Sequence, residues 1–175
     1  MATEKNAGDI TRLIQLSARQ LGRSDYSSAQ IEAALNSAWG LDSQLIADKT
    51  YFQVMAGRTL VGCGGWSFRR TLFGSDSRGD RDSSPLDPAK DAAKIRAFFI
   101  HPDHARQGLG TRLLIHCEQQ AWDSGFTRLE LGATLPGVRL YSTLGYVAGE
   151  AYDFPTGPDT VLAIIPMSKI LRCRP

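Results

Sequence analysis

The stretch FFIHPDHARQGLGTRLL, residues 98–114, decides the fold because it places a strand, a turn and a helix start next to one another. Its apolar beginning runs to Pro102, a polar turn follows, and Gly108 and Gly110 open a segment whose apolar residues recur at helical spacing. The pattern predicts a strand over residues 94–100 and a helix from residue 109 to about residue 124. Residues 127–131 predict another strand, and this order forms a βαβ unit with parallel strands.

The segments on either side of this unit predict antiparallel strands. Upstream, helices are expected over residues 9–21 and from residue 27 or 28 to about residue 40. Strands over residues 50–56 and 59–70 follow, joined by a tight turn at Gly57. Downstream, a short helix over residues 137–144 precedes strands over residues 146–154 and 160–167. The expected fold class is α/β with one mixed sheet: an antiparallel meander, one parallel βαβ crossover and an antiparallel finish.

The length of the chain suits one domain with a sizeable core. Its 175 residues predict a single domain over 1–175. Within it, residues 74–91 consist largely of Ser, Asp, Gly, Arg and Pro, which predicts a polar loop that supports no packing. Aspartates interleave the arginines of this loop, which favours a solvated segment over a nucleic-acid-binding surface.

Charge and cysteine content exclude several further classes. Lys+Arg number 20 and Asp+Glu 18, so the overall electrostatic field is weak and does not favour a nucleic acid or a membrane as partner. Cys63, Cys117 and Cys173 lack CxxC spacing, which predicts neither a disulfide framework nor a zinc site. The first residues lack the apolar core of a signal peptide, and no apolar stretch is long enough to span a bilayer. A soluble cytoplasmic protein is expected.

The turn before the central helix has the chemistry of an anion site. The first amides of a helix lack partners inside the helix and carry partial positive charge. Gly108 and Gly110 remove side chains that would keep an oxyanion away, and Arg106 and Arg112 add charge at the rim. A P-loop is excluded because Thr111-Arg112 follows the last glycine, where that motif needs Lys-Ser/Thr. A dinucleotide site lacks its third glycine at Leu113, although Glu130 stands where a ribose ligand would be.

Two motifs around this turn resemble those of the GNAT superfamily of N-acetyltransferases. The family's strand ending in V/I-x-P, followed by Q/R-x-x-G-x-G/A, is matched by Ile100-His101-Pro102 and by ARQGLG at residues 105–110. LYSTLGY at residues 140–146 resembles the family's later Y-x-x-L-G-F/Y block. The order of expected elements also resembles that family from about residue 8 to residue 170.

The resemblance implies an acetyl-CoA-dependent N-acetyltransferase with a GNAT-like domain whose parallel central strands splay apart. A backbone amide near Phe98 is expected to stabilise the oxyanion that forms in acyl transfer. The implied partner is a small-molecule or peptide amine acceptor, and the family suggests a homodimer. The implied contacts of acetyl-CoA are the pantetheine arm along Phe98, Phe99 and Ile100, and the pyrophosphate on the amides of Ala105, Arg106, Gln107, Gly108, Leu109, Gly110 and Thr111.

Tyr141 is the catalytic residue that the second motif implies, as the general acid that protonates the departing thiolate. The sequence departs from the family pattern at Ala105, where Gln or Arg is common, and at Thr134, where many members have Asn. Some members carry a glutamate base where this chain has Lys94. The remaining candidate bases are Glu130, Asp103 and His101, and a chain of water molecules would also serve.

Family analogy places four residues in the walls of the acceptor cleft: Tyr26, Trp39, Trp66 and Arg69.

The cysteine and histidine residues suggest different chemistry. Cys63 lies in a glycine-rich stretch typical of a nucleophile turn, but no base is matched to it, and a buried cysteine is the alternative. His101, His104 and His116 have no accompanying carboxylate pair, so no metal site is expected.

Two other functions remain open at this point. A non-catalytic module that binds or senses acyl-CoA is suggested by Lys94, Thr134 and the lack of a clear base. An NAD(P)-dependent oxidoreductase is suggested by Glu130 and the glycine turn. The sequence does not name the acceptor amine.

Overall fold

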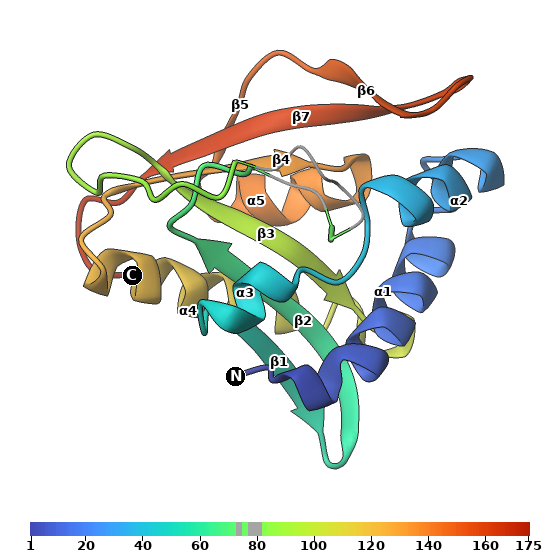
Figure 1. Ribbon diagram of the computed structural model, residues 1–175, viewed down its shortest axis with the longest axis horizontal. Helices are drawn as coiled ribbons and strands as arrows, with labels where there is room; N and C mark the ends of the chain where they lie inside the picture. Colours follow the sequence, from blue (N-terminus) through green and yellow to red (C-terminus); the bar gives the residue numbers. More distant parts are fainter. Residues whose placement is uncertain (73–74, 77–81) are drawn as a thin grey trace.

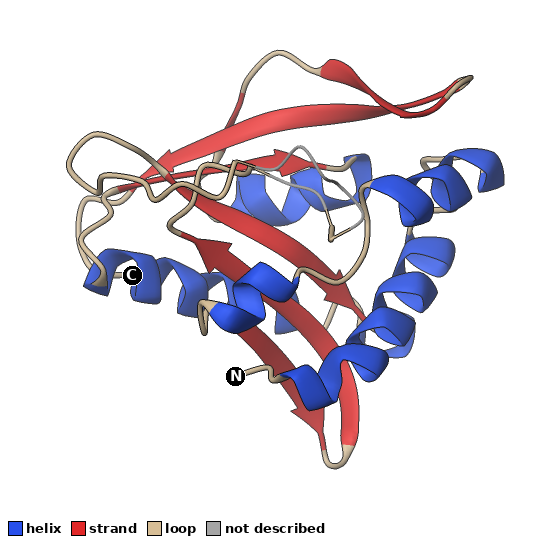
Figure 2. Ribbon diagram, viewed as in Figure 1, coloured by secondary structure: helices blue, strands red, loops and turns tan. Residues whose placement is uncertain are grey.

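The computed structural model describes residues 1–72, 75–76 and 82–175. Figure 1 shows the helices and strands along the chain, and Figure 2 shows which segments are helix and which are strand. The helices are α1 (Ala7–Leu21), α2 (Ser28–Ser37), α3 (Ser43–Ala47), α4 (Leu109–Asp123) and α5 (Val138–Thr143), with short 3-10 turns η1 (Glu4–Asn6), η2 (Pro102–His104) and η3 (Leu135–Gly137). The strands are β1 (Tyr51–Ala56), β2 (Thr59–Ser67), β3 (Ala93–Ile100), β4 (Arg128–Ala133), β5 (Val147–Ala148), β6 (Tyr152–Gly157) and β7 (Thr160–Ile170).

The strands form one mixed sheet in the order β1-β2-β3-β4-β7-β5, with β6 paired to β7. In the described residues only β3 and β4 run parallel, as the βαβ pattern predicts. Helix α4 packs on one face of the sheet, whereas α1 and α3 pack on the other (Figure 1). The α/β mixed-sheet prediction is therefore confirmed.

Local sequence explains where the helices begin. The Ser27 hydroxyl accepts from the Gln30 amide at 3.2 Å, and the Gln30 side chain accepts from the Ser27 amide at 3.0 Å. This capping box satisfies amides that have no partner inside α2. The helices predicted over 9–21 and 109–124 agree with α1 and α4 to within a few residues.

Three parts of the structure differ from the sequence predictions. Helix α3 was not predicted, because five residues are too few to show a helical period. The strand expected over residues 146–154 is divided into β5 and β6, and β2 ends at Ser67 instead of residue 70. At the two strand boundaries, hydrogen bonds to a neighbouring strand decide where each strand ends.

The polar segment expected over residues 74–91 includes packing in its described part. The Leu86 amide donates to the Phe68 carbonyl at 2.8 Å, and the backbones of Arg69 and Pro85 form an isolated antiparallel β-bridge. Leu86 is buried in the core, which corrects the expectation that this segment supports no packing. Backbone pairing needs no apolar side chains, which is why composition missed it. Residues 74 and 77–81 lie outside the described residues.

A bulge in β3 bends the strand beside the site. Ala97 has φ of 57°, and the register between β2 and β3 shifts by one residue between Cys63 and Gly65. The Phe98 ring lies directly over Gly64, where an added Cβ would stand 2.7 Å from a ring carbon. Glycine at residue 64 is therefore needed so that the Phe98 ring can lie flat against β2.

We expect Gly64→Ala to lower the free energy of unfolding by about 1–3 kcal/mol, the usual cost of overpacking a core. Gly8→Ala is the control, because the nearest atom to its added Cβ is the end of the flexible Arg12 side chain at 3.6 Å. That control should be neutral or slightly stabilising, since alanine is the better helix former. Urea denaturation measures both, and equal stability of the two variants would contradict the role given to Gly64.

Candidate active site

A cavity of about 230 Å³ opens where β3 and β4 separate. The parallel pairing covers only Ala93 with Leu129 and Lys94 with Glu130, although both strands continue beyond these residues. Residues 95–100 of β3 line one side of the cavity, and Gly132 and Thr134 at the end of β4 line another. The separation leaves backbone groups of β3 facing a space that β4 would otherwise fill.

The turn before α4 borders one end of this cavity. Gly108 is the N-cap of α4, with φ of 80° and ψ of 2°, and open space lies around the position of its missing Cβ. An added Cβ at Gly110 would stand 3.2 Å from Leu140 and 4.0 Å from Ile100, two residues that line the cavity. Residue 108 thus favours glycine because its φ is positive, and residue 110 favours glycine because Leu140 lies close to it.

The amides at the start of α4 are available to an anion. Within the described chain no side chain caps this helix, and the first helical bond runs from the Arg112 amide to the Gly108 carbonyl at 3.0 Å. The amides of Leu109, Gly110 and Thr111 precede that bond and have no partner in the helix. Arg106, with φ of 62°, belongs to the same turn. The geometry suits a phosphate group.

Tyr141 is held in the wall of the cavity by α5. Its ring centroid lies 6.4 Å from that of Phe98 and 5.8 Å from that of Tyr146. Gly137 permits this position, because an added Cβ there would stand 3.1 Å from the Tyr141 ring. Burial raises the pKa of Tyr141 above its ordinary value, so the phenol stays protonated through the neutral pH range. A protonated phenol beside a cavity is a proton donor.

The structure brings several residues singled out from the sequence to this cavity. Phe98, Phe99, Ile100, Tyr141 and Trp39 line it directly. Of the turn residues 105–111, Gly110 lies beside Leu140 and Ile100 of the cavity wall. Asp42, Arg96, Leu140, Phe154, Leu162 and Ile164 also line it and were not selected from the sequence. Apolar periodicity could have indicated the last four as buried but could not tell a cavity wall from a core.

Tyr26 lies behind Trp39, with ring centroids 5.8 Å apart. Its hydroxyl accepts from the Leu135 amide at 2.8 Å and donates to the Ala163 carbonyl at 3.4 Å. Burial raises the pKa of Tyr26. Tyr26 therefore supports the wall that Trp39 forms and ties η3 to β7.

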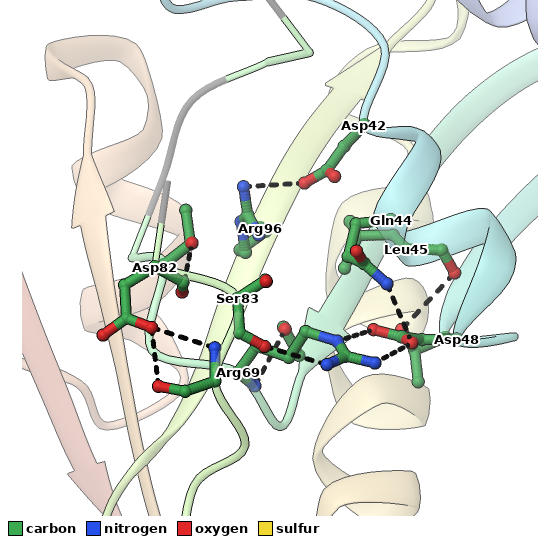
Figure 3. A network of polar contacts seen from close by, with 12 residues as sticks. Asp42, Gln44, Leu45, Asp48, Arg69, Asp82, Ser83 and Arg96 are labelled. Carbon is green, nitrogen blue, oxygen red and sulfur yellow. Dashed lines mark hydrogen bonds and ion pairs between the residues drawn. The ribbon is translucent and has the colours of Figure 1, made fainter. Parts of the chain in front are cut away.

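Trp66 and Arg69 lie away from the cavity, in contrast to the placement that family analogy implied. Trp66 packs edge-on against Phe126 in the core beside α4, with ring centroids 6.0 Å apart. Arg69 pairs with Asp48 through two nitrogens, at 2.6 and 2.7 Å, and donates to the Ser83 carbonyl at 2.8 Å (Figure 3). Trp66 in β2 and Arg69 in the segment after β2 therefore have other surroundings, which sequence spacing alone does not show.

The candidate bases lie outside the catalytic geometry. Glu130 forms an ion pair with Lys94 where the parallel strands meet, and burial lowers the pKa of Lys94. The His101 ring accepts from the Asp103 amide at 3.3 Å and so caps η2. Glu130, Asp103 and His101 are not among the residues that line the cavity.

The remaining reactive side chains have structural surroundings. Cys63 is buried, the Tyr51 hydroxyl donates to its sulfur at 3.3 Å, and burial raises the pKa of the thiol to about 12. A thiol with this pKa is not a nucleophile at neutral pH. The described residues contain no group of three or more His, Cys, Asp or Glu side chains placed to hold a metal ion.

A mixed sheet that opens at its parallel pair, with an uncapped glycine turn at the opening, is the architecture of a protein that binds an extended phosphate-bearing ligand. The model of the Acetyltransferase (GNAT) family matches residues 12–146. The chain belongs to this family.

Solved structures share the fold. A GCN5-related N-acetyltransferase, described as aminotransferase class II, from Rhodopseudomonas palustris is 21% identical with a TM-score of 0.70, covering 97% of this chain and 92% of that chain. The PaiA N-acetyltransferase of Thermoplasma acidophilum in complex with coenzyme A is 13% identical with a TM-score of 0.63, covering 97% and 95%. The putative acetyltransferase YncA of Salmonella typhimurium with acetyl-CoA is 14% identical with a TM-score of 0.60, covering 94% and 90%.

The search of curated proteins finds no match for this chain. In the described part of the chain, every helix is too short or too polar to cross a membrane.

Proposed function

We propose that this protein is an N-acetyltransferase that moves the acetyl group of acetyl-CoA to a primary amine. The observation that carries the proposal is the meeting of three features at one cavity: the separated strands β3 and β4, the uncapped turn at Gly108 and the buried Tyr141. Family membership supports acetyl transfer, and two solved structures of the same fold hold coenzyme A or acetyl-CoA.

The residues present fit acetyl-CoA as co-substrate. Its pyrophosphate would rest on the amides of residues 105–111, where the space around Gly108 is open. Its pantetheine arm would lie along Phe98, Phe99 and Ile100, on the edge of β3 that β4 leaves free. Ala105 has only a methyl side chain, so at residue 105 the backbone alone could contact a phosphate, while Arg106 and Arg112 add positive charge at the rim.

In the proposed reaction, the neutral amine nitrogen attacks the thioester carbon, the new C–N bond forms and the C–S bond breaks. A backbone amide of β3 near Phe98 stabilises the oxyanion, an effect worth about 3 kcal/mol in comparable sites. The Tyr141 phenol protonates the departing thiolate. Water accepts the proton that the amine loses, and water also returns a proton to the Tyr141 phenolate.

The two alternative functions make different predictions. A non-catalytic acyl-CoA module would bind the same co-substrate but transfer nothing, and Lys94 in place of a glutamate base is the observation in its favour. The oxidoreductase alternative loses its support, because Glu130 is paired with Lys94 and the sheet has the GNAT arrangement.

We expect acetyl-CoA and coenzyme A to bind with micromolar dissociation constants in calorimetric titrations, and NADH not to bind. The shared phosphate and pantetheine contacts explain why the acetyl group should change affinity little. A panel of primary amines, followed by mass spectrometry, then tests transfer. Binding without any acetylated product would support the non-catalytic module, and binding of NADH alone would overturn the proposal.

A further inference from the structure

A buried ion pair stands in the wall of the cavity beyond the proposed thioester position. The Arg96 guanidinium and the Asp42 carboxylate are 2.7 Å apart, and their side chains are 2% and 1% exposed. Both residues line the cavity, Arg96 from β3 and Asp42 from the segment before α3 (Figure 3). Arg96 precedes Phe98 by two residues, on the other side of the bulge at Ala97.

The local structure directs Asp42 toward Arg96. Asp42 is the N-cap residue of α3, yet among the described residues its side chain makes no capping bond with that helix. Asp76 takes that part: its two carboxylate oxygens accept from the Ser43 amide at 3.0 and 3.1 Å. The cap of α3 is thus supplied from another segment, while Asp42 faces the cavity.

Stability gives a poor account of this pair. Burying two charges costs several kcal/mol per ion, and apolar residues of similar volume are often as stable or more so. A guanidinium in the cavity wall has a use if it meets a charge that the cavity receives, since its planar fork of donors matches a carboxylate.

The rest of the cavity lining is mostly apolar. Trp39 follows α2, and Phe154, Leu162 and Ile164 come from β6 and β7. A ligand that fits these walls has an apolar body and one anionic group for Arg96. The proposed reaction adds an amine that must reach the thioester near Phe98.

Resting on the proposed function, we infer that the acceptor is an apolar α-amino acid whose carboxylate binds Arg96. Its side chain lies against Trp39, Phe154, Leu162 and Ile164, and its amine points toward β3 at Phe98. Asp42 is a positioning residue that holds the guanidinium at the cavity wall. Reaction with acetyl-CoA yields an N-acetyl amino acid and coenzyme A.

The test compares matched acceptors that differ only in the carboxylate. The pairs are L-leucine with 3-methylbutylamine and L-phenylalanine with 2-phenylethylamine, and L-leucinamide serves as the neutral amino acid. We expect kcat/KM at least tenfold higher for each amino acid than for its decarboxylated partner or amide. Saturation-transfer NMR of L-leucine with the coenzyme A complex reads binding without turnover, and it should show the leucine methyl groups in contact with the protein.

The variant that tests the ion pair is Arg96→Met with Asp42→Leu, which replaces both charges by apolar side chains and keeps the site packed. It should lose the preference for a carboxylate, so that kcat/KM for the two members of each acceptor pair differs by no more than about threefold. The dissociation constant of acetyl-CoA should be unchanged. Arg96→Lys should retain part of the preference. The control is Arg69→Met with Asp48→Leu, which removes the neighbouring ion pair outside the cavity (Figure 3) and should keep the preference.

The outcomes separate this inference from the proposed function. Acetylation of simple amines as fast as amino acids in the wild-type protein would overturn the inference and leave the acetyltransferase intact. An unchanged preference in the Arg96→Met, Asp42→Leu variant, with thermal unfolding like that of the wild-type protein, would also overturn it. Failure to bind acetyl-CoA would remove the proposed function and the inference together.

Discussion

Gly108→Asp should abolish measurable acetyl-CoA binding, with an affinity loss of 100-fold or more. Gly108 has φ of 80°, which costs a residue with a side chain about 1 kcal/mol or more. The new carboxylate would also stand where the pyrophosphate is proposed to lie. Two like charges about 4 Å apart near a protein surface repel by about 4 kcal/mol, and a 100-fold loss requires only about 2.7 kcal/mol.

Two further variants separate charge from backbone strain. Gly108→Ala carries the strain alone and should weaken binding by less than Gly108→Asp. Gly57→Asp places the same residue at a positive-φ glycine with open surroundings in the β1–β2 turn, which does not line the cavity, and should bind acetyl-CoA like the wild-type protein. Calorimetric titration measures all three. If Gly108→Asp bound acetyl-CoA normally, the turn would serve only to start a helix.

Tyr141→Phe should lower kcat by about 100-fold, the lower end of what general acids contribute, and leave the dissociation constant of acetyl-CoA nearly unchanged. Phenylalanine keeps the ring that packs against Phe98 and Tyr146, and it lacks only the hydroxyl group that carries the proton. Steady-state release of coenzyme A gives kcat with an acceptor from the panel, and calorimetry gives the dissociation constant.

Tyr146→Phe is the matched control for that variant. Tyr146 is a buried tyrosine of the same core cluster, but it lies outside the lining of the cavity. We expect its kcat to stay within a few-fold of the wild-type value. Parallel losses of kcat and of acetyl-CoA affinity in Tyr141→Phe would instead show that Tyr141 has a structural role.

The local motifs carried most of the fold prediction. Proline, polar turn and glycines over residues 98–114 mark a strand end and a helix start by backbone chemistry that depends on neighbouring residues only. Helix α3 and the pairing of Leu86 with Phe68 escaped prediction because partners distant in sequence stabilise them. Family analogy places Trp66 and Arg69 in the cleft, and only the tertiary contacts of β2 and of the segment after it show that they lie elsewhere.

The sequence by itself determined the order of elements apart from α3 and the division of β5 from β6, together with the glycine turn at residues 105–110 and the tyrosine of α5, because each depends on short-range spacing. Tertiary structure decided where β3 and β4 separate, since the bulge at Ala97 and the end of the parallel register arise from pairing between strands. It also decided that Asp42 meets Arg96. These residues are far apart in the chain, and only packing of the segment before α3 against β3 brings their opposite charges together at the cavity.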